Sequence, residues 1–126
     1  MKQEAEGMIT KVMYHKLANN ALEVLSERLE DELIDAEQDY KDGNLQVKIQ
    51  GVGEYVFNKQ PYTMQIWASS PITGPRKFDL GRDAWIDPRS GVSLQSYMGR
   101  ELERINIKQK QTGDDQQSKE VADVQS

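Results

Sequence analysis

The first part of the chain carries its apolar residues at helical spacing. From Tyr14 onward these residues recur every three or four positions and fall on one stripe of a helix, while acidic residues gather on the opposite side. The pattern predicts an amphipathic helix over about residues 11–35. The members of its apolar stripe are Leu17, Ala18, Ala21, Leu22, Leu25, Leu29 and Leu33.

Alternation with a period of two replaces the helical spacing after the turn at Asp42–Gly43. Such alternation is typical of strands that bury one face. Further short strands are expected near 64–69, 76–80 and 84–87, because turns that contain proline and glycine separate these segments. The inward-facing residues of the first strands are predicted to be Leu45, Val47, Ile49, Tyr55 and Phe57.

A second helix is predicted after the last strand. Ser93 is a good N-cap residue, and apolar residues follow it at helical spacing. Beyond about residue 108 the sequence is rich in Gln, Asp, Lys and Ser and has no periodicity, which is typical of a disordered tail. We therefore expect a flexible segment over 1–9, one folded domain over 10–107 and a disordered tail over 108–126. The apolar face of this second helix consists of Leu94, Tyr97, Met98, Leu102 and Ile105.

The order of helix, strands and helix predicts an α+β fold. In this two-layer α/β sandwich, the two terminal helices pack on one face of an antiparallel sheet of five to seven strands. The other face of the sheet is left free for partners.

The composition excludes several classes of function. A chain of 126 residues with 37% hydrophobic residues forms one domain with a modest core. No apolar run approaches the roughly 20 residues that span a bilayer, so we expect no membrane association. The net charge is −5, whereas nucleic-acid binding requires clustered Lys and Arg, so we expect no nucleic-acid partner. The absence of cysteine excludes disulfides, thiolate catalysis and clusters held by thiolates of this chain.

The single histidine gives no support to a hydrolytic site. His15 has no orienting partner that the sequence can identify, so a Ser–His–Asp arrangement cannot be defended. We interpret His15 as a polar residue near the start of the first helix, although it could join one carboxylate at a metal.

Trp67 lies in a strand-like segment among polar, uncharged residues. Alternation places Ile66 and Ala68 on one side and Gln65, Trp67 and Ser69 on the other. Because glutamine and serine are poor core residues, Trp67 is expected on the open face of the sheet, where an indole is a good binding anchor. The alternative is a half-buried tryptophan that the following loop covers.

A ridge of carboxylates occupies the exposed side of the first helix. Clustered carboxylates suit hard cations, which bind weakly unless a rigid cage forms. Acidic pairs four residues apart also repel each other unless a counter-charge is present. The alternative is an ordinary solvated helix face. The ridge consists of Glu23, Glu27, Glu30 and Asp31, continued after the helix by Asp35, Glu37 and Asp39.

Several segments of the chain resemble one family. Asn58-Lys59-Gln60-Pro61, Gln65-Ile66-Trp67, Ser69-Ser70-Pro71 and Gly74-Pro75 are similar to the sheet signature of frataxins. The resemblance extends over roughly residues 10–107 without large gaps, which makes it specific. The loop rich in proline and serine is similar to that of the eukaryotic, mitochondrial branch of the family.

The resemblance implies a regulator of iron–sulfur cluster assembly in the mitochondrial matrix, in a mature form that lacks its transit peptide. Such a protein docks on the complex of cysteine desulfurase and scaffold protein and promotes transfer of persulfide sulfur to the scaffold. It is mainly a non-catalytic activator, and it is a monomer that iron can assemble into oligomers. The alternative is an iron oxidase and store, or a chaperone that delivers Fe(II), because the family is also credited with ferroxidase activity.

The resemblance also implies which residues act. Iron is expected to bind weakly at the surface, at Glu23, Glu27, Glu30, Asp31, Asp35 and Glu37. The partner complex is expected to contact Asn58, Lys59, Gln60, Gln65, Ile66, Trp67 and Lys77. The chain departs from its relatives at both sites. At the ridge it has asparagine where acids are frequent, and at the sheet it has threonine for a frequent asparagine, methionine for a frequent lysine and lysine for a frequent arginine. These departures are Asn19 and Asn20 at the ridge, and Thr63, Met64 and Lys77 at the sheet.

Overall fold

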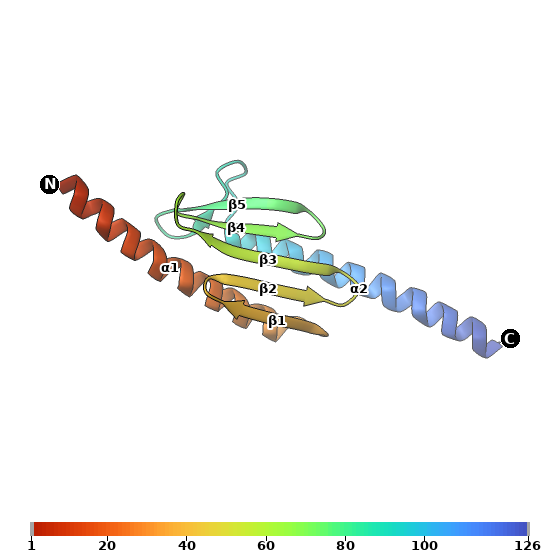
Figure 1. Cartoon of the computed structure of the whole chain (residues 1–126). Helices are drawn as coiled ribbons and strands as arrows, with labels where there is room; N and C mark the ends of the chain where they lie inside the picture. The colour runs from red at the N-terminus through yellow and green to blue at the C-terminus, as the bar shows by residue number, and fades with distance from the viewer. Residues whose placement is uncertain (1, 126) are drawn as a thin grey trace.

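The chain forms a sheet with a helix at each end of the sequence (Figure 1). In this computed structural model, the backbone is described for residues 2–125 and the side chains for residues 10–111. Helix α1 spans Lys2–Glu32 and helix α2 spans Leu94–Gln125. The strands are β1 (Ala36–Lys41), β2 (Asn44–Ile49), β3 (Gly53–Gln60), β4 (Gln65–Ser70), β5 (Gly74–Leu80) and β6 (Trp85–Ile86).

The six strands form one antiparallel meander in the order in which they occur along the chain. Figure 1 shows both helices behind the sheet, so they cover the same face. The predicted α+β sandwich is therefore confirmed, and the strand count lies within the expected five to seven. The opposite face of the sheet carries no helix within the part of the chain that the structure describes.

Strand β1 was not predicted from the sequence. The acidic residues after the first helix were expected to extend its ridge, but α1 ends at Glu32 and Asp35 turns the chain with a φ of 57°. The pattern of β1 is weak because Gln38 occupies one of its inward positions. The Gln38 amide donates to the Ser26 carbonyl oxygen at 3.0 Å and accepts from the Ser26 hydroxyl, so an inward polar side chain is satisfied against α1.

Both helices extend further toward the ends of the chain than predicted. The first was expected over 11–35 but spans Lys2–Glu32, so it begins earlier and ends sooner, and the second continues to Gln125. Gln109 still contacts the domain, since its Nε2 lies 3.4 Å from the carbonyl oxygens of Ile34 and Gln50. The side chains of 1–9 and 112–126 lie outside the described residues, so the flexible N-terminal segment and the disordered tail stay predictions.

The core lies between the sheet and the two helices. Both predicted apolar helix faces contribute to it, except that Leu17 remains 38% exposed. At 100° per residue, Leu17 lies about 100° from the centre of the α1 stripe, so it falls at the margin of the packed face. The fully buried large side chains include Tyr14, Leu22, Leu25, Leu29, Leu45, Tyr55, Phe57, Ile66, Phe78, Leu94, Met98 and Ile105.

A buried carboxylate joins α2 to the sheet. Glu101 is only 2% exposed, and its Oε2 accepts hydrogen bonds from the Tyr55 hydroxyl at 2.6 Å and the Ser70 hydroxyl at 2.8 Å. The Thr73 hydroxyl donates to the other carboxylate oxygen. Ser70 Oγ in turn accepts from the backbone N–H groups of Ile72 and Thr73, at 3.0 Å each. The network therefore fixes the turn between β4 and β5 and compensates the desolvation of a buried carboxylate.

The same network changes the acidity of two tyrosines. Burial raises the pKa of Tyr55 far above its ordinary value of 10.0, and the hydrogen bond to Glu101 adds to the rise. Burial also raises the pKa of Tyr97, and the nearby charge of Glu101 adds to it. Both phenols stay protonated in the native state at pH values where the unfolded chain ionises.

We expect the free energy of unfolding to fall steeply in alkali. Below about pH 10 both states keep these two phenolic protons, so their contribution is constant. Above about pH 10 only the unfolded chain loses them, which lowers the free energy of unfolding by about 1.4 kcal/mol per pH unit for each tyrosine. Urea unfolding between about pH 9 and pH 11 measures the slope, and Tyr55→Phe reduces it by one tyrosine's share. A free energy that stays constant across this interval would contradict the assignment.

Candidate functional site on the open sheet face

The register of the central strands aligns the polar side chains of the open face. Asn58 of β3 pairs with Trp67 of β4, and Trp67 pairs with Lys77 of β5. In the next row Gln60 pairs with Gln65, and Gln65 pairs with Asp79. Alternate residues on these strands are buried against the helices, so both rows point away from the core. The structure thus brings together five of the seven residues predicted to contact a partner.

The indole of Trp67 is held in one orientation. Its Nε1 donates to Gln65 Oε1 at 2.8 Å, and Gln65 Nε2 donates to Asp79 Oδ1 at 2.6 Å. The ammonium group of Lys77 lies 4.5 Å from the centre of the indole ring, in a cation–π contact. Trp67 is half-buried, as the alternative interpretation held, but its cover includes Lys77 of the neighbouring strand.

The turn next to these rows presents a second aromatic ring that the sequence analysis did not single out. Gln60 Nε2 donates to Asn58 Oδ1 at 3.0 Å at the end of β3, and the chain then turns through residues 61–64. Met64 has a φ of 54°, and the N–H of Thr63 is 3.3 Å from the Gln60 carbonyl oxygen. This turn leaves Tyr62 fully exposed. An aromatic residue in a short turn beside Trp67 was the signal that could have identified it.

Two of the residues predicted to contact a partner lie on the other face. Ile66 is completely buried in the core, because it faces the helices on β4. Lys59 also points toward α1, where its ammonium group donates to Asn19 Oδ1 at 2.8 Å and lies 3.1 Å from His15 Nδ1. Since an ammonium group can only donate, His15 accepts at Nδ1. Neither side chain belongs to the open face, and Asn19 and His15 serve to hold Lys59.

The acidic ridge is divided between two surfaces. Glu23, Glu27, Glu30 and Asp31 are exposed on α1, whereas Glu37 lies on β1 and pairs in register with Lys48. Asp35 stands in the connection between these elements. Among the residues whose side chains are described, no group of three or more His, Asp or Glu is arranged to hold a metal ion. The structure therefore presents a spread of carboxylates and not a preformed cage.

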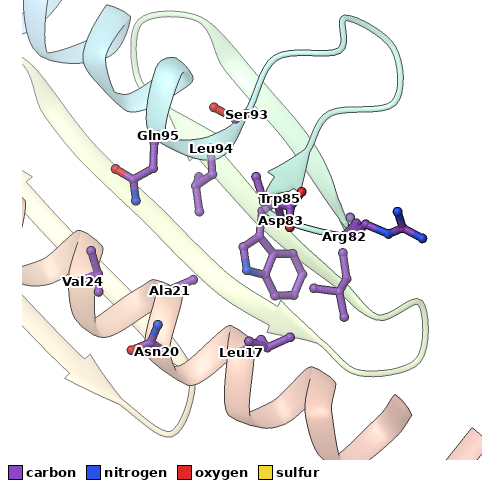
Figure 2. Close-up of a pocket in the computed structure, with 13 residues that line it drawn as sticks. Leu17, Asn20, Ala21, Val24, Arg82, Asp83, Trp85, Ser93, Leu94 and Gln95 are labelled. Atoms are coloured by element: carbon purple, nitrogen blue, oxygen red, sulfur yellow. The ribbon is translucent and has the colours of Figure 1, made fainter.

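An apolar groove lies on the helix side of the molecule (Figure 2). Its volume is about 260 Å³, and Figure 2 shows the Trp85 indole between α1 and the start of α2. Leu17 and Val24 of α1 and Leu94 of α2 line it. The partial exposure of Leu17 is explained by its position at this groove.

No described helix is long and apolar enough to cross a membrane.

Comparison with known proteins identifies the family. A sequence model of the frataxin-like domain matches residues 7–108. The chain belongs to the frataxin family. Frataxin from Trachipleistophora hominis is 34% identical over 92 residues, which cover 73% of this chain and 84% of that protein. Mitochondrial frataxin from Arabidopsis thaliana is 39% identical over 99 residues, which cover 73% of this chain and 53% of that protein.

The family is associated with iron–sulfur cluster assembly. A bacterial member, the iron–sulfur cluster assembly protein CyaY of Thioalkalivibrio sulfidiphilus, is 39% identical over 89 residues, which cover 68% of this chain and 82% of that protein. This chain spans only about half the length of the frataxins from A. thaliana and Saccharomyces cerevisiae, at 53% and 55%.

Solved structures agree with this assignment. Trimeric frataxin from S. cerevisiae, crystallised with ferrous iron, matches with a TM-score of 0.59 and 32% identity, over 73% of this chain and 83% of that chain. Frataxin from Psychromonas ingrahamii matches with a TM-score of 0.69 over 78% of this chain and 92% of that chain. Its identity is 18%, so this second match supports the fold alone.

Gln65 is expected to determine the orientation of the Trp67 indole. In Gln65→Met the indole N–H and the Asp79 carboxylate both lose their partner, which should lower the free energy of unfolding by about 1 kcal/mol. The two tryptophans give two indole N–H signals in NMR spectra, and only that of Trp67 should move and exchange faster with water. Gln46→Met, on the outward face of β2, is the matched control and should leave both signals in place. An unmoved Trp67 signal in Gln65→Met would show that the amide does not hold the ring.

Proposed function

We propose that this frataxin regulates iron–sulfur cluster assembly by docking its open sheet face on a complex of cysteine desulfurase and scaffold protein. The observation that carries the proposal is the row formed by Asn58, Trp67 and Lys77, which aligns an aromatic ring, an amide and a cation on a face that no described helix covers. Aromatic residues with fixed orientation are frequent anchors at protein interfaces. We place this activity in the mitochondrial matrix, since the relatives from A. thaliana and S. cerevisiae are mitochondrial.

The hydrogen bonds of the face support a docking role. Gln65 fixes Trp67, and Gln60 fixes Asn58, so these side chains lose little conformational freedom when a partner binds. Amides also offer both donors and acceptors to the backbone of a partner loop. The face is therefore suited to an extended segment of another protein.

Activation by such docking requires only a difference in affinity. If the sheet face binds better to the arrangement in which persulfide sulfur can pass to the scaffold cysteine, binding increases the population of that arrangement. A tenfold preference, equivalent to about 1.4 kcal/mol, is enough to change the flux several-fold. No catalytic group of this chain is needed for that step, which fits a non-catalytic activator.

We further propose that iron is bound weakly at the carboxylates of α1. The S. cerevisiae relative was crystallised with ferrous iron, and the described acids of this chain are exposed and spread along the helix. Such ligands keep most of the hydration shell of the cation, so the affinity is low. This arrangement favours an iron-responsive surface over an oxidase centre, in which carboxylates converge on the metal.

The Trp67→Ala variant tests the docking proposal. We expect it to weaken binding to the purified desulfurase–scaffold complex by about 2 kcal/mol or more, roughly 30-fold, and to abolish stimulation of sulfide production. The loss in unfolding free energy should stay below about 2 kcal/mol, because the ring is half-buried and outside the core. Lys48→Ala, on the outward face of β2, is the control and should retain both binding to the complex and stimulation of sulfide production. Trp67→Ala protein that still stimulates the complex fully would refute the docking surface.

A ridge variant tests the iron proposal. We expect the combination of Glu23→Gln, Glu27→Gln, Glu30→Gln and Asp31→Asn to reduce Fe(II) binding in an anaerobic titration followed by amide NMR shifts. Relief of repulsion should also raise the free energy of unfolding by a few tenths of a kcal/mol per acidic pair.

The control for the ridge variant removes the same charge elsewhere, through Asp42→Asn, Glu54→Gln, Asp83→Asn and Glu103→Gln. All four control positions are exposed. Iron-dependent shifts that spare residues 23–37, together with a less stable ridge variant, would show that the ridge is a structural charge network.

A further inference from the structure

A basic hollow lies beside Trp67, between β5 and the loop that follows β6. Its volume is about 500 Å³, and its polar lining consists of Gln65, Arg76, Lys77, Asp87, Arg89 and Ser90. Two proline residues complete the walls. Three cations face one carboxylate there, so the lining is positive although the chain carries a net charge of −5. The docking row of Asn58, Trp67 and Lys77 does not account for this positive charge.

The single carboxylate in the hollow is used for internal structure. Asp87 is 6% exposed and accepts from the Arg89 N–H at 2.9 Å and the Ser90 hydroxyl at 3.1 Å. It also pairs with Arg76 at 3.5 Å. Asp87 therefore fixes the loop and neutralises Arg76. The other acid near the hollow, Asp79, is engaged with the Gln65 amide.

Two cations of the hollow have no acidic partner within the described residues. Lys77 and Arg89 are both exposed, and neither forms an ion pair. Lys77 lies over the Trp67 ring at 4.5 Å, whereas Arg76 is packed over the Tyr97 ring at 5.2 Å. These ring contacts hold Arg76 and Lys77 in place, so the hollow is already formed in the absence of a ligand.

The hollow is continuous with the docking row. Arg76 and Lys77 line both this hollow and a shallow depression of about 140 Å³ over Asn58 and Trp67. One partner surface can therefore contact the indole and the free cations together. A guanidinium and an ammonium group that have no acidic partner among the described residues are suited to carboxylates, which accept two hydrogen bonds from an arginine.

We propose that the hollow receives an acidic segment of the partner protein, whose Asp or Glu side chains pair with Arg89 and Lys77 while the neighbouring surface covers Trp67. The identity of the partner in this inference rests on the proposed function. The acidic character of the segment is inferred from the charges of the hollow. Charge pairs at the margin of an interface mainly accelerate association and select the partner. The contribution of Arg89 is therefore strongest at low salt.

The first test uses a peptide of six glutamates and ¹⁵N-labelled protein. We expect shifts at the amides of residues 76–77 and 89–91 and at the Trp67 indole, and their loss in Arg89→Glu. Arg100→Glu, an exposed site on α2, introduces the same charge change and should retain the shifts. Shifts that are spread over all lysines, or that persist in Arg89→Glu, would overturn the proposal.

The second test measures binding to the desulfurase–scaffold complex. At about 50 mM salt, Arg89→Glu should weaken binding at least tenfold and Arg100→Glu less than twofold, and the difference should shrink at about 500 mM salt. Equal affinities of the two variants at low salt would overturn the inference, even if Trp67→Ala abolishes binding and so supports the proposed function. The peptide could bind at the hollow while the wild-type protein fails to bind the complex. That result would refute the proposed function and the proposed partner, but it would support an acidic ligand for the hollow. Melting curves of both variants confirm that they are folded.

Discussion

The pairing of β3, β4 and β5 determines which side chains meet on the open face. Because all three strands are antiparallel neighbours, a residue that faces outward on one strand is aligned with outward residues on the next. A shift of one residue in β4 would bury Trp67 and expose Ile66, which is fully buried. The two helices stabilise this register, because they cover only the sheet face that carries the buried apolar side chains. The exposed chemistry is therefore a consequence of how the core is packed.

The sequence was sufficient for the features that depend on periodicity. Both helical stripes, the outward phase of Trp67 and the alternation of Leu45 and Val47 follow from repeats that the core requires, and the structure agrees with them. Strand β1 was missed because Gln38 occupies an inward position and is satisfied by Ser26, a contact that no local pattern reveals. The family resemblance supplied the association with iron–sulfur cluster assembly, which composition and spacing could not.

Side-chain partnerships were the part that could not be predicted. Alternation along β3 puts Lys59 on the face opposite Asn58, but its partner Asn19 lies 40 positions away on α1, which no local pattern reveals. The pairing of Gln65 with Asp79 joins residues 14 positions apart and depends on the strand register. Likewise, Arg76, Lys77 and Arg89 read as scattered charges in the sequence, and only the approach of the loop after β6 toward β5 gathers them around one hollow. Residues 10–111 consequently present an acidic surface on α1 and a basic one beside Trp67.

Gln65 of β4 makes contacts on both faces of the sheet. Its backbone carbonyl oxygen accepts the hydroxyl of Tyr14 from α1 at 2.8 Å, while its side chain holds the indole of Trp67 on the opposite face. Burial raises the pKa of Tyr14, so this hydroxyl keeps its proton and remains a donor. A change that removes only this hydroxyl, such as Tyr14→Phe, can thus disturb a surface that Tyr14 never touches. Changes that remove the ring would instead be dominated by the loss of core packing, because Tyr14 is fully buried, so only the loss of the hydroxyl alone would separate recognition from folding.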